Sequence, residues 1–186
     1  LITWDANGDP AVVAVGTVGQ VLTSGGVGVA TTMQTLAASK GLIQTVNSSY
    51  ATYVATSTAF PVATSLPQNT EGAEITTVTI TPTSASTKLL ITCSLFISHT
   101  TGNWCGAGLF QDSTAGALAS IGSYTDPGNA GLVFFWQHYM TSGTTSSTTF
   151  KVRAGPSSGT ANINGVGSAY FGSTMPTTIT VQEIEA

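Results

Sequence analysis

The chain has 186 residues, of which 6% are charged and 41% are hydrophobic. An average soluble domain has about 25% charged residues, so this surface must be completed by Thr, Ser, Asn and Gly or be covered by partner chains. The apolar fraction argues against disorder, the net charge of −4 with four Lys and Arg residues argues against nucleic-acid binding, and no apolar run approaches the roughly 20 residues of a membrane span.

Residues 1–41 are predicted to form an extended, glycine-rich collar. Asn7-Gly8-Asp9-Pro10 indicates a turn, residues 11–15 favour a short strand, and residues 31–40 favour a turn of helix or a linker. Between them, Val21 and Leu22 are too few apolar residues to bury a core in one chain. We therefore expect identical copies to wrap around one another here, with Val21 and Leu22 at a trimer interface. The glycines lack the Lys-Ser or Lys-Thr pair of a phosphate-binding loop, so no nucleotide is expected.

Residues 42–186 are predicted to form one antiparallel β-sandwich domain with jelly-roll-like connectivity. Short strands recur about every ten residues between Gly, Ser, Asn and Pro turns, as is typical of all-β sandwiches. Residues 61–72 are predicted to be a loop. The expected strands are 42–57 (one or two), 75–81, 88–98, 104–111, 117–121, 131–141, 148–154, 161–163, 168–171 and 177–184.

The strongest strand signal is KLLITCSLFIS at residues 88–98. Its odd positions are all apolar, which predicts one fully buried face. The other face is only half polar, because Leu90 and Phe96 alternate there with Thr and Ser. We expect these two side chains to be covered by a loop, a second sheet edge or another subunit, and we assign them to a trimer interface.

The two cysteines, Cys93 and Cys105, fall on consecutive predicted strands. In a simple hairpin turning near Gly102, Cys93 would lie opposite a residue near Leu109. A disulfide is therefore disfavoured, and two small buried thiols are expected.

Catalytic chemistry is not indicated by any motif. His99 and His138 are the available histidine bases, no Gly-x-Ser-x-Gly elbow is present, and carboxylates are sparse. We expect no enzyme activity, no cofactor and no metal. A three-imidazole metal site on a trimer axis is the alternative, although a hydrogen-bonded strand histidine is favoured over it.

Aromatic residues are the candidates for ligand binding, since aromatic faces next to polar side chains hold neutral glycans. The candidates are Trp104, Trp136, Tyr124, Tyr139 and Tyr170. Trp136, beside Phe134 and Phe135, is instead favoured as a residue of the core or of the trimer interface. Trp104 and Tyr124 adjoin predicted turns, where binding residues usually lie. The predicted receptor-binding residues are Trp104, Tyr124, Asn103 and Asn129.

Five segments, in order along the chain, resemble bacteriophage tail-fibre proteins. GTVGQVLTSGGVGVATT (16–32) resembles the collar that precedes their terminal domains. The segments that resemble their C-terminal β-domain are LIQTVNSS (42–49), ITTVTITPTSASTKLLIT (75–92), TTFKVRAG (148–155) and TTITVQEIEA (177–186). FFWQHYM (134–140) and WCGAGLFQD (104–112) depart from the family pattern, at places where a receptor-binding tip is expected to vary.

The resemblance implies a homotrimeric fibre or spike on the virion surface. Its N-terminal side would join other virion structural proteins, and its distal end would bind a host surface glycan or protein. Because the sequence begins with Leu1 and shows no secretory signal, we expect it to be the C-terminal part of a longer protein. The alternative function is purely structural, a fibre or appendage domain of capsid, neck or tail that trimerises without contacting host.

Overall fold

The computed structural model describes residues 2–5, 7–13, 15–27, 29–35, 41–128 and 130–186. It divides into two compact units, residues 1–40 and 41–186. The prediction for residues 31–40 is partly corrected, because Thr32–Thr35 form a strand; residues 36–40 lie outside the described residues.

The first unit consists of two small antiparallel hairpins. One pairs β1 (Ile2–Trp4) with β2 (Pro10–Val12), and the other pairs β3 (Gln20–Thr23) with β4 (Thr32–Thr35). The predicted turn before Pro10 is present: Gly8 has φ +87°, and the Asp5 carboxylate accepts the backbone N–H groups of Asn7 and Asp9 at 2.8 and 2.9 Å. These hydrogen bonds, that from Asp9 most strongly, lower the pKa of Asp5.

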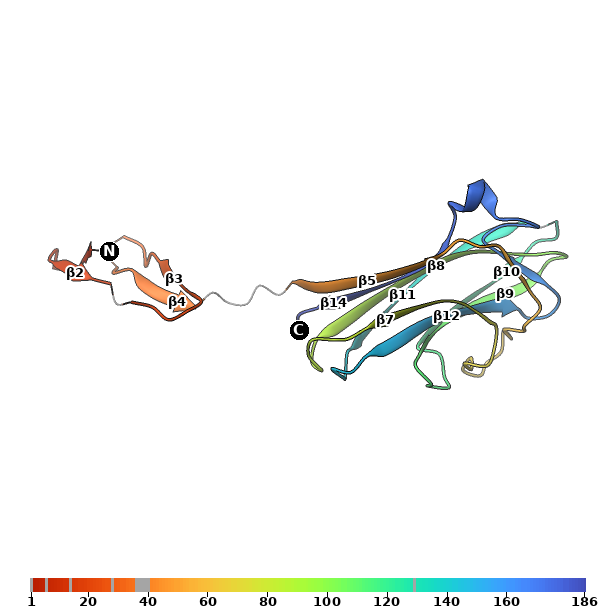
Figure 1. Ribbon diagram of the computed structural model, residues 1–186, viewed down its shortest axis with the longest axis horizontal. Coiled ribbons are helices and arrows are strands. Elements are labelled where there is room, and N and C mark those ends of the chain that lie inside the picture. Colours follow the sequence, from red (N-terminus) through yellow and green to blue (C-terminus); the bar gives the residue numbers. More distant parts are fainter. Residues whose placement is uncertain (1, 6, 14, 28, 36–40, 129) are drawn as a thin grey trace. The chain divides into compact units, whose positions relative to one another are not determined.

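The second unit is all-β with antiparallel pairing, as predicted (Figure 1). Sheet I contains β5 (Leu42–Tyr50), β6 (Val54–Thr56), β8 (Lys88–His99), β11 (Gly131–Thr141), β13 (Ala161–Ile163) and β14 (Thr177–Ile184). Sheet II contains β7 (Ala73–Ile80), β9 (Asn103–Gln111), β10 (Ala119–Thr125) and β12 (Thr148–Pro156). The strands of the two sheets lie in two layers in Figure 1, an arrangement consistent with a β-sandwich.

Strand β8 lies at the centre of sheet I. One of its edges pairs with β11 from Lys88 to Ser98, and the other pairs with β14 and then with β13. Its odd-numbered side chains from Leu89 to Ile97 are buried and its even-numbered ones are half-buried up to Phe96, which confirms the predicted alternation. The buried side chains form one core with Ala107, Leu109, Phe150 and Val152 of sheet II.

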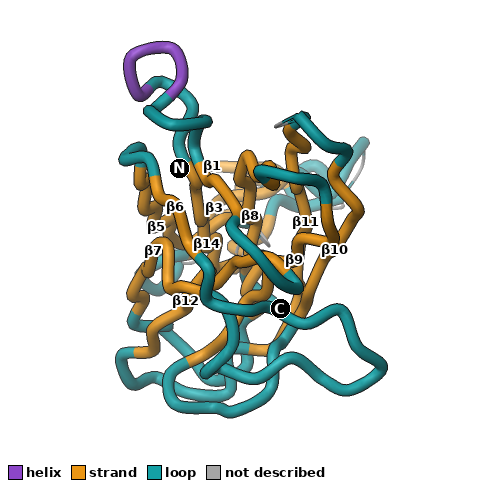
Figure 2. Tube along the Cα trace, turned by 90° about the vertical axis from the view of Figure 1, so that its right-hand side faces the viewer, coloured by secondary structure: helices purple, strands orange, loops and turns teal. Residues whose placement is uncertain are grey.

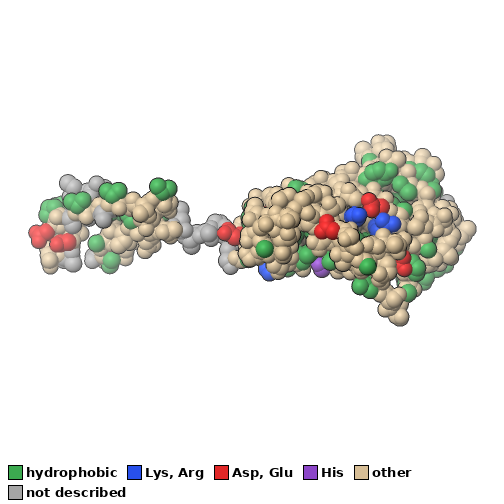
Figure 3. Space-filling model, turned by 60° about the horizontal axis from the view of Figure 1, so that its bottom comes forward, with side chains coloured by type: hydrophobic (Ala, Val, Ile, Leu, Met, Phe, Trp, Pro, Cys, Tyr) green, Lys and Arg blue, Asp and Glu red, His purple; other side chains and the backbone are tan. Residues whose placement is uncertain are grey.

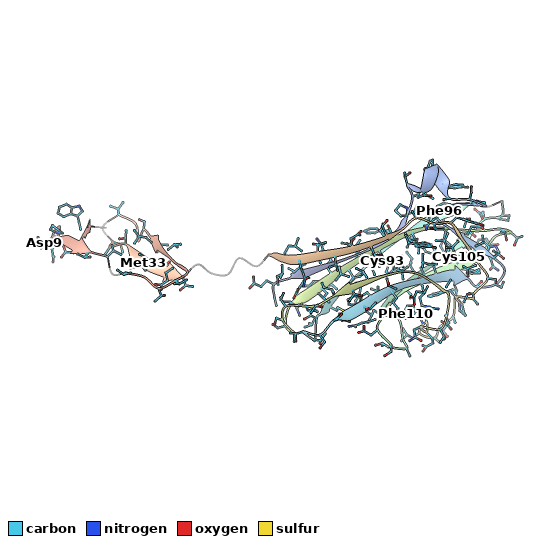
Figure 4. The ribbon with its side chains drawn as sticks, in the orientation of Figure 1. Asp9, Met33, Cys93, Phe96, Cys105 and Phe110 are labelled. Carbon is cyan, nitrogen blue, oxygen red and sulfur yellow. The ribbon has the colours of Figure 1, made fainter. Side chains whose placement is uncertain are left out.

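The connection between β8 and β9 differs from the prediction. A simple hairpin would pair the two strands, but β8 belongs to sheet I and β9 to sheet II. Cys93 and Cys105 therefore face the core from different sheets (Figure 4), and both are buried, free thiols. Burial raises the pKa of Cys93 to about 12; burial likewise raises that of Cys105, to about 11, although a hydrogen bond with Thr125 lowers it.

Two strand predictions required correction. The segment expected as strand 168–171 instead contains a 3-10 turn, η1 (Tyr170–Ser173), which stands off the sheets in Figure 2. It includes Phe171 at φ +51°, a left-handed conformation that a bulky residue rarely adopts. The strand expected at 117–121 begins at Ala119 and continues to Thr125, so it includes Tyr124.

A buried carboxylate links strand β14 to β5 and to the β7–β8 loop by hydrogen bonds at one end of the sheets. Glu183 on β14 is fully buried, and its oxygens accept hydrogen bonds from Gln44 Nε2 (2.6 Å), the Thr87 hydroxyl (2.7 Å), and the Thr83 N–H and hydroxyl (both 2.8 Å). Thr83 and Thr87 lie in the loop that leads from β7 of sheet II to β8 of sheet I. Although burial alone would raise it, the hydrogen bonds lower the pKa of Glu183 to about 2.

Candidate functional site

Trp104 and Tyr124 form an exposed aromatic pair on the outer face of sheet II. They lie directly opposite each other in the β9–β10 register, with ring centroids 6.2 Å apart in an edge-to-face arrangement. Their side chains are 44% and 48% exposed. Two of the predicted receptor-binding residues are thus brought together, and each keeps about half of its surface free for a ligand.

A polar network holds the start of β9 in place behind this pair. The Asn103 side-chain oxygen accepts the Trp104 N–H at 2.8 Å and the Ser157 hydroxyl at 3.1 Å, and its amide nitrogen donates to the Ser158 hydroxyl at 2.8 Å. Buried His99 adds to it: Nδ1 accepts the Thr101 N–H, so Nε2 donates to the Ser158 carbonyl at 2.8 Å. The network gives Asn103 a positioning role for Trp104.

The sheet II outer face is partly covered by residues 57–72, named here the strap. Phe60 of the strap is buried, and its ring lies over Gly106 and Gly108 of β9, where an added Cβ would come within 2.5 and 3.1 Å of ring atoms. The Phe60 N–H donates to the Pro156 carbonyl at 2.8 Å. These glycines are therefore needed for a close approach of the strap to the sheet.

A small hollow, named here the trough, lies between the strap and β10. Its volume is about 150 Å³. It is lined by Phe60, Pro61, Val62, Ala63, Ser65, Pro67, Gly106, Ser120, Ile121 and Gly122. Gly106 and Gly122 are cross-strand partners next to the Trp104–Tyr124 pair on the same face of the sheet, so the aromatic pair adjoins the trough.

Charged residues on this face are paired with one another. Arg153 and Lys151 of β12 lie 3.3 and 3.8 Å from a Glu74 carboxylate oxygen, and Arg153 also donates to the carbonyls of Glu71 and Gly72 at 2.9 and 2.7 Å. Figure 3 shows Lys and Arg side chains beside Asp and Glu side chains on this unit. The cluster anchors the end of the strap.

The sheet I outer face is different, because it is uncovered along β11 and its paired rows carry one charge, that of Lys88 in the end row Thr141–Lys88–Ile184–Leu42. Val133, Phe135 and Tyr139 of β11 are 71%, 58% and 59% exposed. The rows of cross-strand neighbours are Tyr139–Leu90–Gln182–Thr45, Gln137–Thr92–Thr180–Asn47, Phe135–Ser94–Thr178–Ser49 and Val133–Phe96. An apolar column on β11 thus borders a field of Thr, Ser, Asn and Gln.

Phe96, a predicted interface residue, is half-buried by its own chain. Its ring lies 5.6 Å from that of Tyr170, which in turn lies 6.0 Å from Phe171, and it packs against Gly131, where an added Cβ would overlap it. A loop therefore supplies part of the cover that the sequence pattern required. Leu90 is also half-buried.

The remaining predicted residues lie elsewhere. Val21 and Leu22 lie on β3 of the first unit, opposite Gln34 and Met33, and Leu22 is 39% exposed. Asn129 lies outside the described residues. Trp136 is buried in the core, as predicted.

Sequence reasoning missed the exposed column on β11 and the strap. The alternation in GLVFFWQHYMT could have revealed the first, because Phe134 and Trp136 are buried while their neighbours Val133 and Phe135 are exposed. The strap lacks a periodic signal of its own. The packing role of Phe60 can be recognised only from the structure, in which its ring lies over glycines of β9.

The described residues offer little for metal or nucleophile chemistry. They contain no group of three or more His, Cys, Asp or Glu side chains placed to hold a metal ion. Both His99 nitrogens make hydrogen bonds within the chain, and burial lowers the pKa of His138 on β11. The exposed aromatic pair on sheet II and the exposed apolar column on sheet I remain the candidate functional surfaces.

No known family model matches the chain, and no curated protein matches its sequence. The part of the chain that the structure describes holds no helix that could serve as a membrane span.

Proposed function

We propose that this chain is a non-enzymatic component of a virion fibre or spike. In this proposal, a glycine-rich collar precedes a jelly-roll-like domain, three copies associate, and the domain binds a host surface glycan or protein during adsorption. The order of tail-fibre-like segments supports the class of protein and the number three. The contrast between the two outer faces supports the division of labour within the domain.

The observation that carries the proposal is the sheet I outer face. It exposes Val133, Phe135 and Tyr139 in a single column, and exposed apolar patches on soluble domains mark interaction sites. The paired rows from Tyr139 to Val133 carry no charge, since Lys88 lies in the next row, so two copies can meet along this column without like-charge repulsion. The sheet I outer face is therefore assigned to self-association, with Leu90 and Phe96 of β8 beside the column.

The sheet II outer face is assigned to the host. Its Trp104–Tyr124 pair is exposed yet fixed from behind by Asn103, which reduces the conformational entropy lost on binding. Tyr and Trp are the residue types enriched in binding hot spots. The two functions thus use opposite sides of the domain.

The test measures assembly and adsorption with the full chain. Light scattering after gel filtration gives the mass, and a pull-down with a panel of bacterial strains gives adsorption. We expect a trimer that adsorbs to at least one strain, with Trp104→Ala and Tyr124→Ala each lowering adsorption without changing the mass. Thr77→Ala, an exposed change on the same sheet, is the matched control.

The purely structural alternative gives a different result in the same assay. A stable trimer that adsorbs to no strain would support a structural fibre or appendage domain. A monomer at all concentrations would remove the assignment of the sheet I outer face. Adsorption unchanged by both aromatic substitutions would remove this part of sheet II from receptor binding.

A further inference from the structure

The trough beside the aromatic pair has a shape and chemistry that indicate a ligand class. We propose that it binds one ring of a neutral saccharide, with the neighbouring rings lying over Trp104 and Tyr124. This inference rests on the proposed function, because it names the receptor class for the same surface.

The open part of the trough floor is the bare backbone of Gly122, because the Phe60 ring covers its partner Gly106. Gly106 and Gly122 are directly paired, and a Cβ on Gly122 would find no side chain closer than Val62, at 3.7 Å. The Trp104–Tyr124 pair lies two residues away from the glycine pair on each strand, about 6.6 Å at 3.3 Å per residue. A flat ring on Gly122 would therefore lie between the aromatic pair and the strap residues Phe60 and Val62.

The lining suits a sugar ring. Ser65 and Ser120 supply hydroxyls that both donate and accept hydrogen bonds, as sugar hydroxyls require. Phe60 and Val62 supply apolar surface, and the electron-rich faces of the aromatic pair attract the weakly positive C–H groups of a pyranose.

The absence of charge favours a neutral ligand. The lining residues include no charged side chain, and the nearby Lys151 and Arg153 are held by Glu74 and the strap carbonyls. A carboxylated or sulfated sugar would lose hydration at the trough without gaining a cation.

The size favours one ring of a longer chain. The trough measures about 150 Å³, whereas pockets that enclose drug-sized ligands measure about 300–1,000 Å³. A ligand in it therefore extends out across the neighbouring surface, where Trp104 and Tyr124 lie.

The experiment uses a strain that adsorbs the full-length wild-type trimer. Cells are treated with periodate, which cleaves vicinal diols of sugars, or with a protease, and binding is measured from about 50 mM to about 1 M NaCl to vary charge screening. The test variant is Gly122→Val, which fills the floor, and Thr77→Val on the same sheet is its control. Gly122→Ala is the milder second variant, and near-ultraviolet circular dichroism confirms that each is folded.

We expect periodate to abolish adsorption, protease and salt to leave it within about twofold, and Gly122→Val to weaken it by about tenfold or more, as for the loss of a binding hot spot. Loss after protease but not periodate would indicate a protein receptor and overturn the saccharide assignment while leaving adhesion intact. Loss in high salt would indicate a charged ligand and overturn neutrality. Wild-type adsorption by both Gly122 variants would exclude the trough. If no strain adsorbs the chain, the proposed function fails first and this inference fails with it.

Discussion

The two outer faces of the second unit are built from similar strands but finished in different ways. Sheet I leaves an apolar column on β11 uncovered, and the paired rows from Tyr139 to Val133 carry no charge, since Lys88 lies in the next row. The outer face of sheet II is partly covered by the strap. The Phe60 ring of the strap packs on glycines of β9, and strap carbonyls accept hydrogen bonds from Arg153. On sheet II the chain itself buries apolar surface under the strap. The exposed apolar column of sheet I can be buried only by another molecule.

The largest expected effect is on assembly. Phe135→Asp places a charge in the exposed column of sheet I, and association would bring copies of that charge into a dry interface, at a cost of several kcal/mol. We expect the variant to be a folded monomer by light scattering at concentrations where the wild type is a trimer. Thr77→Asp on sheet II is the control and should remain trimeric. A trimeric Phe135→Asp variant would break the comparison.

A second large effect is expected at the cover of sheet II. Phe60→Ala removes a buried ring that lies over Gly106 and Gly108 and should lower the free energy of unfolding by about 4 kcal/mol. Urea titration measures it, and Val62→Ala, at an exposed strap residue, should cost less than about 1 kcal/mol. If Phe60→Ala lowered the free energy of unfolding no more than the control does, the packing of the strap on the sheet would contribute little to stability.

An intermediate effect on stability is expected at Glu183. This residue binds the loop that connects the two sheets, so its loss should not affect one outer face more than the other. Its pKa falls from the ordinary 4.5 to about 2 on folding. Its stabilisation is therefore complete above pH 4.5 and is lost as the pH falls from 4.5 to 2, amounting to about 3 kcal/mol. Glu183→Gln should abolish this part of the acid dependence in urea titrations between pH 2 and 6. An identical acid profile for the variant would show that other carboxylates cause it.

The smallest of these effects concerns the loop that covers Phe96. Asn164 is buried with φ +61°; its amide donates to the carbonyls of Tyr50 and Thr52 at 2.8 and 3.0 Å, and its side-chain oxygen accepts the Thr177 hydroxyl at 2.9 Å. Asn164→Ala should cost about 2 kcal/mol through these unpaired groups and the strained φ. Asn164→Gly separates the two causes, since it relieves only the strain. Equal stability of both variants would assign the whole effect to the lost hydrogen bonds.

Strands whose burial alternates could be predicted from sequence, and those with mixed patterns could not be placed accurately. β8, β7 and β14 have the period-2 signal, and their ranges were predicted within about two residues. The pairing of β8 and β9 was misjudged because a short turn between two strands is compatible both with a hairpin and with a crossing between sheets. The 3-10 turn at Tyr170 was mistaken for a strand because its aromatic residues have high strand propensity, although Gly172 interrupts them.

In the candidate site, too, some features could be predicted from the sequence and others could not. Exposure of Trp104 and Tyr124 could be anticipated from adjacent turns, but their edge-to-face contact depends on the β9–β10 register, which the sequence pattern did not determine. The role of Asn103 depends on Ser157 and Ser158, more than fifty residues away. Contacts of this range follow from topology, which local patterns do not encode.

The pairing of β5 with β14 has a consequence for biosynthesis. In sheet I, β5 pairs with β14. Asn47 of β5 and Thr180 of β14, which are hydrogen-bonded across this pair, are 133 residues apart in sequence. At about 5–20 residues per second, a ribosome would leave β5 without this partner for on the order of ten seconds. Strands left open in this way invite pairing with other nascent chains. The Thr, Asn and Ser residues of β5 keep that waiting segment hydrated until its own partner is made.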